Sequence, residues 1–425
     1  MGVSELAARL LNDFSVHLPQ WRKLDPIGHL QRARSDQDLL AIFAAIGDRH
    51  THCALPTRRV AWLPFVAGAC SEGVLVTGSL SDDLQRGDRI VRWNGIPIAS
   101  ALRALMPLQL GANRAARAAK AMQTLTFRPL SLMPPPAEQR VTIELDGGRR
   151  IELPWRVDGP ETLGRELAPL FSSSETMLSE NIGVSGRTIR IASFSATPDA
   201  FLQTFLQALE SVPQDGVIID LMGCEEGIIQ TAEQLLQLFT SQRIEPETFR
   251  FRMTDAVRGI AGRLPPEWRD TILRSRGVYS RTQTITTPDQ ANHLGRRYRG
   301  PVVVLVDALT YSSAEMFAAG VQDHGIGKVM GTAPRTGGGG ASAWSQKTIA
   351  ELTGDDDLRP RPDAPSFRVA VRKARRVLRN DGRAIERSGI IPDILYVPTR
   401  ADLLERKRAI RMEAGRILAE MKKRR

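Results

Sequence analysis

Two adjacent serines, Ser312 and Ser313, follow the apolar run PVVVLV at a predicted strand-to-helix turn. A serine hydroxyl becomes an effective nucleophile only when a nearby base accepts its proton. The same segment also fits a structural role, because Ser312 and Glu315 have the S-x-x-E spacing of a helix capping box. The local sequence alone therefore favours a cap, and a nucleophile needs support from other parts of the chain.

Groups that could give this support lie far away in the sequence. His50 and His52 belong to the segment DRHTH, and Glu386 belongs to the segment IERSGIIPD. Histidine suits the role of base because its unperturbed pKa lies near neutrality. A carboxylate can fix the imidazole tautomer and stabilise the imidazolium, either directly or through another side chain or water. Taken singly, each of these residues is also typical of an ordinary structural position.

Length and composition set the class of protein. A chain of 425 residues is long enough for two or three domains with substantial cores. It contains no run of 18 apolar residues, so we expect no membrane insertion. The N-terminal residues lack the pattern of a signal peptide, which predicts a cytoplasmic location. An extracytoplasmic or secreted location by another route stays open.

Cysteine usage and charge argue against several other classes. The three cysteines are dispersed, which favours neither a disulfide scaffold nor a zinc site, and we expect no metal and no cofactor. The formal charge of +11 could attract nucleic acid, but residues 401–425 alone hold nine basic and four acidic residues. Such a tail is typical of a solvated surface helix, and no basic stripe with aromatic residues is present. We therefore expect no nucleic-acid partner.

The pattern of apolar residues divides the chain into three regions. Residues 1–58 have helical spacing, and residues 59–157 contain short strands, with a hairpin turn predicted at the DGG sequence. Residues 158–425 alternate between apolar strands and amphipathic helices, which predicts βαβ units and a mostly parallel sheet. Within this third region, residues 241–300 are a candidate lid. The fold class is therefore α/β with several domains.

Four segments, in order, resemble the C-terminal processing or tail-specific proteases of peptidase family S41. EGVLVTGSLSDDLQRGDRIVRWNGIPIAS resembles the PDZ domain embedded in such proteases, and GVIIDLMGCEEG resembles a family strand ending in a Gly-Gly turn. GPVVVLVDALTYSSAEMFAAGVQDHGIGKVMGT resembles the nucleophile segment, and AIERSGIIPDILYVPT resembles the closing strand. The resemblance spans roughly residues 35 to 405 and implies an inserted PDZ-like domain beside a catalytic core.

The resemblance implies that Ser312 is the nucleophile, and it also limits the identity of the base. Gly337 stands where the Ser-Lys members of the family have their lysine, and Lys347 is only a reserve candidate. The chain is more similar to the Ser-His-Glu branch, which includes the tricorn protease and the chlamydial protease-like activity factor. That branch implies His50 as the base, with His52 in reserve, and Glu386 as the orienting carboxylate.

Backbone N–H groups must stabilise the oxyanion of a tetrahedral intermediate. Ser313 is expected to supply one donor, since it directly follows the nucleophile at a helix N-terminus. Gly227 is expected to supply the other, although Glu226 replaces the first glycine of the usual Gly-Gly pair. The run Gly337–Gly340 would allow close approach of a backbone, and Asp323 matches a family residue that supports the nucleophile helix.

The resulting function is a serine endopeptidase that hydrolyses peptide bonds through an acyl-enzyme. Its partner would be a peptide or protein substrate, and a homo-oligomer is an open alternative. The PDZ-like region could bind a peptide end by strand addition. The weakened turn at Glu226 favours an alternative function, a catalytically inert ligand- or peptide-binding protein on the same scaffold.

Overall fold

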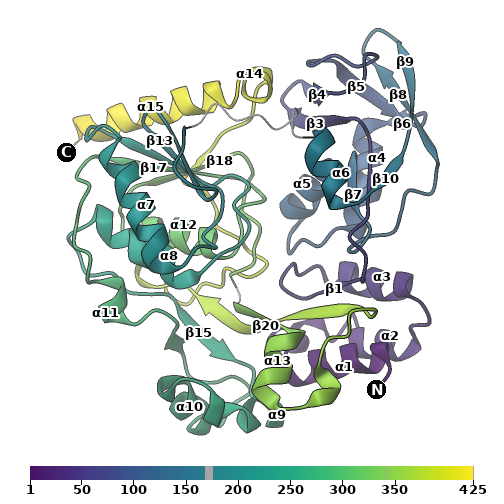
Figure 1. Ribbon diagram of the computed structural model, residues 1–425. Helices are drawn as coiled ribbons and strands as arrows, with labels where there is room; N and C mark the ends of the chain where they lie inside the picture. The colour runs from purple at the N-terminus through teal and green to yellow at the C-terminus, as the bar shows by residue number, and fades with distance from the viewer. Residues whose placement is uncertain (168–175, 341, 425) are drawn as a thin grey trace.

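The computed structural model describes residues 1–167, 176–340 and 342–424, so residues 168–175 of the predicted third region lie outside the described residues (Figure 1). Its N-terminal region is helical, as predicted. Helix α3 begins at the capping box of Ser35 and Asp38 and ends at Gly47, whose φ of 70° turns the chain out of the helix. The loop carrying His50 starts at this point. The helices are α1 (Val3–Phe14), η1 (Leu18–Trp21), α2 (Pro26–Arg32) and α3 (Asp36–Ile46).

The next region, from Val60 to Asp158, is rich in β-structure and has its own apolar core, which includes Val76, Trp93 and Ile143. The predicted hairpin turn joins β8 to β9. Whether this β-rich unit is a PDZ domain stays a prediction. One antiparallel sheet has the order β3 (Phe65–Cys70), β4 (Gly73–Ser79), β5 (Arg89–Trp93), β8 (Arg140–Leu145), β9 (Arg150–Pro154), with β6 (Ile96–Pro97) on β5. The remaining elements are β2 (Val60–Trp62), β7 (Phe127–Pro129), β10 (Arg156–Asp158), α4 (Ile98–Leu105), η2 (Met106–Leu108) and α5 (Arg114–Thr124).

A seven-stranded sheet forms the centre of the third region and confirms the predicted α/β core. Its order is β11-β12-β13-β14-β17-β18-β21, and it is parallel from β13 to β21. Alternate residues of each central strand face opposite sides, so that Ile219 and Val304 pack under helices α7, α8 and α12. The strands are β11 (Thr176–Met177), β12 (Ile182–Ser185), β13 (Thr188–Ile191), β14 (Val217–Asp220), β17 (Val302–Val306), β18 (Lys328–Gly331) and β21 (Ile394–Leu395); the helices are α7 (Pro198–Glu210), α8 (Ile229–Leu236) and α12 (Ser313–Asp323).

The other face of this sheet is covered by the C-terminal helix α15 (Arg408–Lys423), which runs along the top of Figure 1 after α14 (Arg400–Leu404). The prediction of a solvated helix was wrong for one side of it. Ile410 and Leu418 of α15 are buried against Ile218 and Val303 of the sheet. The apolar residues of this helix therefore complete the core, while its charged residues lie on the outer side.

Residues 241–300, the candidate lid, belong to a second sheet. Strand β15 (Thr248–Phe251) pairs with β16 (Gln283–Thr284) and with the long strand β20 (Ser366–Arg375). Strand β20 also pairs with β1 (His52–Ala54), directly after the His50 loop, and with β19 (Ser342–Ser345). The lid role stays a prediction. Around this sheet lie α9 (Asp255–Gly259), η5 (Ala261–Arg263), α10 (Pro266–Leu273), α11 (Pro288–Ala291), α13 (Gln346–Thr353) and η6 (Asp356–Leu358); α6 (Pro160–Leu167), η4 (Gln237–Phe239) and η7 (Leu378–Asn380) lie elsewhere.

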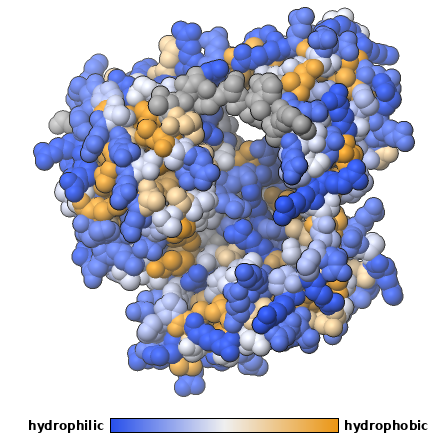
Figure 2. Space-filling view, viewed as in Figure 1, coloured by the Kyte–Doolittle hydropathy of each residue, from blue (hydrophilic) through white to orange (hydrophobic). Residues whose placement is uncertain are grey.

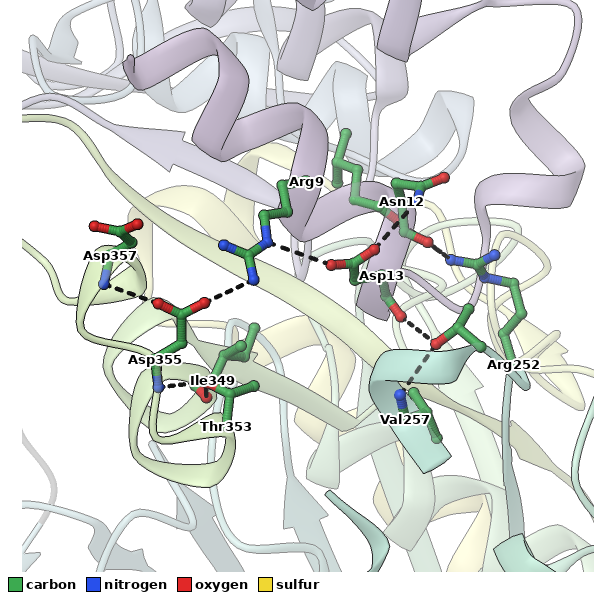
Figure 3. A network of polar contacts seen from close by, with 11 residues as sticks. Arg9, Asn12, Asp13, Arg252, Val257, Ile349, Thr353, Asp355 and Asp357 are labelled. Carbon is green, nitrogen blue, oxygen red and sulfur yellow. Dashed lines mark hydrogen bonds and ion pairs between the residues drawn. The ribbon is translucent and has the colours of Figure 1, made fainter. Parts of the chain in front are cut away.

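Polar contacts tie helix α1 to this second sheet and its neighbours (Figure 3). Arg9 Nη2 donates to Asp355 Oδ2 at 2.7 Å, beyond the end of α13. At the C-terminal end of the helix, Thr254 Oγ1 donates to the carbonyl of Asp13 at 2.6 Å, and Arg252 Nε donates to the carbonyl of Ser15 at 2.7 Å. The N-terminal helices are therefore fixed to segments more than two hundred residues away in the sequence, which orients the loop that follows them.

Candidate active site

The turn between β17 and α12 carries the two serines and is fastened to the turn that follows β14. Tyr311 N–H donates to the carbonyl of Cys224 at 2.9 Å, and Thr310 Oγ1 donates to the carbonyl of Leu221 at 3.0 Å. Gly223 N–H donates in the opposite direction, to Asp307 Oδ1 at 3.0 Å. The two segments predicted to supply the nucleophile and an oxyanion donor are therefore neighbours.

Ser312 has a strained backbone at the start of helix α12. Its φ of 57° and ψ of −126° lie in a region that L-residues other than glycine rarely adopt. Such a conformation costs about 1–3 kcal/mol and persists only where the surrounding structure enforces it. Ser312 occupies the N-cap position, but its side chain makes no capping hydrogen bond. The predicted capping box was therefore wrong.

The carboxylate of Glu315 binds the glycine-rich loop. Its Oε1 accepts from Gly338 N–H at 2.8 Å and from Thr336 Oγ1, and its Oε2 accepts from Gly339 N–H at 2.7 Å. Burial raises the pKa of Glu315 to about 7, against the opposing effect of these donors. The first turn of α12 therefore holds the loop, a role that the S-x-x-E pattern concealed.

The run Gly337–Gly340 is tightly packed rather than open. A Cβ atom on Gly337 would lie 2.0 Å from Cδ2 of Tyr311, and one on Gly339 would lie 1.8 Å from its Cζ. Gly338 has a φ of 81°, which also favours glycine. The glycines therefore allow the loop to lie flat on the ring of Tyr311, the residue before Ser312.

His50 lies beside the same tyrosine ring. The rings of His50 and Tyr311 meet edge to face, with centroids 5.0 Å apart. Asp48 organises the loop, because its Oδ1 accepts from His50 N–H at 3.0 Å and its Oδ2 accepts from Thr51 Oγ1 at 2.7 Å. The loop geometry is that of a short acidic side chain bonding the backbone two residues ahead. The structure thus places His50 beside Tyr311, the residue before Ser312, while its role as a base stays a prediction.

The imidazole of His50 is neutral at physiological pH. Only 3% of the residue is exposed, and burial lowers its pKa to about 3, against the opposing charge of Asp48. Among the described residues, Nδ1 of His50 has no hydrogen-bond partner, and no hydrogen bond joins His50 to Ser312. A neutral imidazole is the form that can accept a proton, and catalytic hydrogen bonds are often long before substrate binds.

Glu386 lies close to this loop but makes no hydrogen bond to His50 within the described residues. Its Oε1 accepts from the N–H of Ala374, and its Oε2 is buried without a partner. Burial raises the pKa of Glu386 to about 8, so the carboxyl group is largely protonated at neutral pH. It lines a small pocket together with Asp48, Gly338 and His17. The carboxylate bonded to the His50 segment is Asp48, which the sequence reasoning missed despite the D-x-H spacing.

The two predicted oxyanion donors have free N–H groups. Within the described residues, neither Ser313 N–H nor Gly227 N–H makes a hydrogen bond. Gly227 has a φ of 152°, and a Cβ there would lie 2.2 Å from Cβ of Phe194. Phe194 pairs with the residues on both sides of Gly227, through the carbonyl of Glu226 at 3.1 Å and the N–H of Ile228 at 3.0 Å. Since successive N–H groups in an extended chain alternate in direction, that of Gly227 points away from Phe194.

The reserve candidates lie in different surroundings. His52 is the first residue of β1, the strand that pairs with β20, and its Nδ1 lies 2.7 Å from the carbonyl oxygen of Arg49. Lys347 is on helix α13 with 74% of its side chain exposed, and it pairs with Glu351 at 3.9 Å. Asp323 forms a buried ion pair with Arg376 at 2.5 Å at the end of α12. Within the described residues, no hydrogen bond or ion pair joins the side chain of His52 or of Lys347 to the turn before α12, whereas Asp323 supports that helix at its C-terminal end.

Seen from outside, the molecule is hollowed between the seven-stranded core and the β-rich unit, and the visible walls of the hollow are largely hydrophilic (Figure 2).

The sequence model of peptidase family S41 matches residues 187–396. This range contains Gly227, Ser312 and Glu386, whereas His50 lies before it.

Solved structures share the fold over nearly the whole chain. Mature CPAF gives a TM-score of 0.73 at 17% identity, covering 98% of this chain and 95% of that one. A serine-to-alanine mutant of CPAF gives 0.72 at 17% identity, covering 99% and 95%. Mature CPAF complexed with lactacystin gives 0.67 at 17% identity, covering 99% and 96%. At this identity the comparison shows the fold alone.

Proposed function

We propose that this chain is a serine endopeptidase of the S41 type that acts through an acyl-enzyme, and the match of residues 187–396 to the model of peptidase family S41 supports this proposal. The observation that carries the proposal is the strained backbone of Ser312, with its φ of 57°, at a turn between a buried strand and a buried helix. A serine held in this way presents its hydroxyl away from the helix, as in the nucleophile elbows of other hydrolases. Its side chain does not cap the helix, so the strain has no local structural benefit.

In the proposed reaction, Ser312 Oγ attacks the carbonyl carbon of the scissile peptide while His50 accepts the hydroxyl proton. The negative charge that develops on the carbonyl oxygen is stabilised by the N–H groups of Ser313 and Gly227. His50 then gives its proton to the departing amine as the tetrahedral intermediate collapses to the acyl-enzyme. Water repeats the sequence with His50 as base and releases the acid product.

Two observations support histidine rather than lysine as the base. Gly337 occupies the position of the family lysine, and it lies against the ring of Tyr311 with no room for a side chain. Lys347 is well exposed on another helix. His50, by contrast, is buried, neutral and in contact with the residue before Ser312.

The carboxylate of the proposed triad has two candidates. The family resemblance favours Glu386, whose partnerless Oε2 and the partnerless Nδ1 of His50 could be joined through water. The resting structure favours Asp48, because it is bonded to the His50 backbone and contributes the opposing charge felt by the imidazole. We propose Asp48 as the charge that stabilises the imidazolium, with Glu386 as the alternative.

Covalent labelling gives a direct test. Wild-type protein is treated with a fluorophosphonate probe, and the modified peptide is identified by mass spectrometry; lactacystin, bound by CPAF in a solved complex, serves as a second probe. We expect modification at Ser312, and loss of both labelling and proteolysis of an unfolded protein substrate in Ser312→Ala. Proteolysis that survives in the folded Ser312→Ala protein contradicts the proposal.

One observation favours the inert binding protein as a second candidate. Glu226 replaces a glycine in the oxyanion turn, and its half-exposed side chain is held by Arg368 at 3.4 Å. A folded wild-type protein that reacts with neither probe at any pH, yet binds peptides, would support this alternative.

A further inference from the structure

Helix α5 belongs to the β-rich unit, yet one of its faces lies on the candidate active site. Asn113, Arg117 and Lys120 are spaced i, i+4 and i+7, which places them on the same side of the helix. Over seven residues a helix rises about 10 Å, enough to span several loops. Each of the three side chains contacts a different segment of the N-terminal region or the core.

Asn113 holds the glycine-rich loop. Its Oδ1 caps the helix by accepting from Ala116 N–H at 3.0 Å. Its Nδ2 donates outward, to the carbonyl of Thr336 at 2.8 Å and to that of Gly337 at 3.2 Å. Glu315 accepts hydrogen bonds from N–H groups of the same loop. Asn113 and Glu315 therefore both hold the glycines against the ring of Tyr311.

Lys120 holds the oxyanion turn and, through it, the His50 loop. Its Nζ lies 2.5 Å from Glu225 Oε1, and Glu225 Oε2 pairs with Arg49, the residue before His50. The three side chains are only 21–22% exposed. Burial acts to raise the pKa of Glu225, but the two cations outweigh it and the pKa is lowered, so Glu225 is charged. Partly buried, connected ion pairs of this kind constrain geometry more than exposed pairs do.

Arg117 lies between these two contacts and meets the end of helix α3. Its Nη2 donates to the carbonyl of Ala44 at 3.3 Å. A Cβ on Gly47, where the His50 loop begins, would lie 1.9 Å from the same nitrogen. Arg117 therefore contacts the point at which the loop segment with the candidate base begins.

We propose that α5 is a positioning element of the active site, with Asn113 and Lys120 as positioning residues that act through the glycine-rich loop and Glu225. This inference rests on the proposed peptidase function. The nucleophile, the base and the oxyanion donors come from separate segments, and small displacements between them are costly, up to about 100-fold in rate for about 1 Å. Helix α5 bonds directly to the glycine-rich loop and to Glu225, and it reaches the His50 loop through the ion pair of Glu225 with Arg49, from outside the residues that the family model matches.

The experiment separates positioning from folding with matched variants of the full chain. Asn113→Asp keeps the helix cap but loses the two donors to the loop, since aspartate is an equally good cap without an N–H group. Lys120→Met removes the charge and keeps the stem, whereas Lys120→Arg restores it. Arg114→Ala, at an exposed position of the same helix, is the control.

For each variant, the labelling rate of Ser312 by a fluorophosphonate is measured over a range of probe concentrations. We expect the rate at saturating probe to fall about 10- to 100-fold in Asn113→Asp and Lys120→Met. The half-saturating concentration should stay within about twofold, Lys120→Arg should recover most of the rate, and Arg114→Ala should match wild type. Wild-type rates in both Asn113→Asp and Lys120→Met would overturn the inference while leaving the peptidase function intact.

A second readout does not depend on activity. Hydrogen exchange at the amides of Gly338 and Gly339 reports whether the loop is still held, and thermal unfolding reports global stability. Faster exchange of these amides in Asn113→Asp, with an unchanged unfolding midpoint, supports the positioning role. Unchanged exchange counts against it, even if the wild-type protein is never labelled and the proposed function fails.

Discussion

The phenol of Tyr311 donates a hydrogen bond to Asp48 Oδ1 at 3.3 Å, which joins the residue before the candidate nucleophile to the loop of the candidate base. The ring between these two ends lies against His50 on one side and against the glycine-rich loop on another. A single side chain thus sets the relative position of Ser312 and His50. The hydroxyl group of Tyr311 can be removed without its ring, which tests the hydrogen bond separately from the packing.

Tyr311→Phe keeps the ring and loses only the hydroxyl. We expect the unfolding free energy to fall by about 1 kcal/mol, because Asp48 retains its donors from His50 and Thr51. The labelling rate of Ser312 should fall about tenfold, since the His50 loop loses its tether to the nucleophile turn. Chemical denaturation and probe kinetics measure the two effects, and a labelling rate equal to wild type would show that this hydrogen bond has no part in alignment.

Ser312→Gly should stabilise the protein while abolishing its reactivity. Glycine adopts a φ near 57° without strain, so part of the roughly 1–3 kcal/mol stored at this position is released. Ser312→Ala is the matched control, because it removes the hydroxyl and retains the strained backbone. We expect the glycine variant to unfold at a higher denaturant concentration than the alanine variant, and the reverse order would mean that the backbone of Ser312 is relaxed.

The pH dependence of labelling should reflect a base that is neutral well below pH 6.5. Burial lowers the pKa of His50 to about 3, so the folded protein keeps this imidazole unprotonated where an exposed histidine would be charged. We expect the second-order labelling rate to stay near its maximum from pH 7 down to about pH 5. An acidic limb with a midpoint at pH 6.5 or above would show that His50 is exposed in solution or is not the base.

The same shift gives a stability prediction with a definite sign. The unfolded chain protonates His50 near pH 6.5 and the folded chain does not, so the unfolded state binds more protons between about pH 6.5 and 3. Stability from this residue is therefore lost as the pH falls through that window. His50→Gln should reduce the difference in unfolding free energy between pH 7 and pH 5, as measured by urea titration at both values.

Asp48→Asn and Glu386→Gln distinguish the two candidate carboxylates. If Asp48 provides the charge beside the imidazole, Asp48→Asn lowers the labelling rate about 100-fold or more at pH 7. Glu386→Gln replaces a carboxyl group that is already largely protonated, so its rate should change by less than about tenfold. The opposite ranking assigns the role to Glu386.

Glu386→Gln should also change the pH dependence of stability, with a sign opposite to that of a paired carboxylate. The folded pKa of Glu386, about 8, lies above that of an unfolded glutamate, so its favourable contribution is present at low pH and lost as the pH rises to about 8. The glutamine variant should therefore gain stability relative to wild type between pH 5 and pH 8. A constant difference between the two proteins across this range would indicate an ordinary pKa.

Much of the fold could be predicted because local patterns carry it. The apolar runs around Ile219 and Val304 have the length of strands, and they alternate with amphipathic helices. This alternation predicts a buried parallel sheet. The end of helix α3 at Gly47 and the hairpin at Gly147 follow from glycine's access to positive φ. The burial of helix α15 could not be predicted in the same way, because its mixed charge conceals an apolar stripe that matters only when a sheet face needs covering.

For the candidate site, the kinds of groups and their rough order could be read from the sequence: two serines at a helix start, a histidine loop and a glycine-rich segment in place of a lysine. Their contacts with one another became visible only in the folded chain. Glu315 binds the glycine-rich loop, Asp48 bonds to the His50 segment, and Lys120 reaches Glu225 from another unit. Spacing along a chain governs contacts within one helix or turn, whereas contacts between distant segments depend on packing, and no short pattern records them.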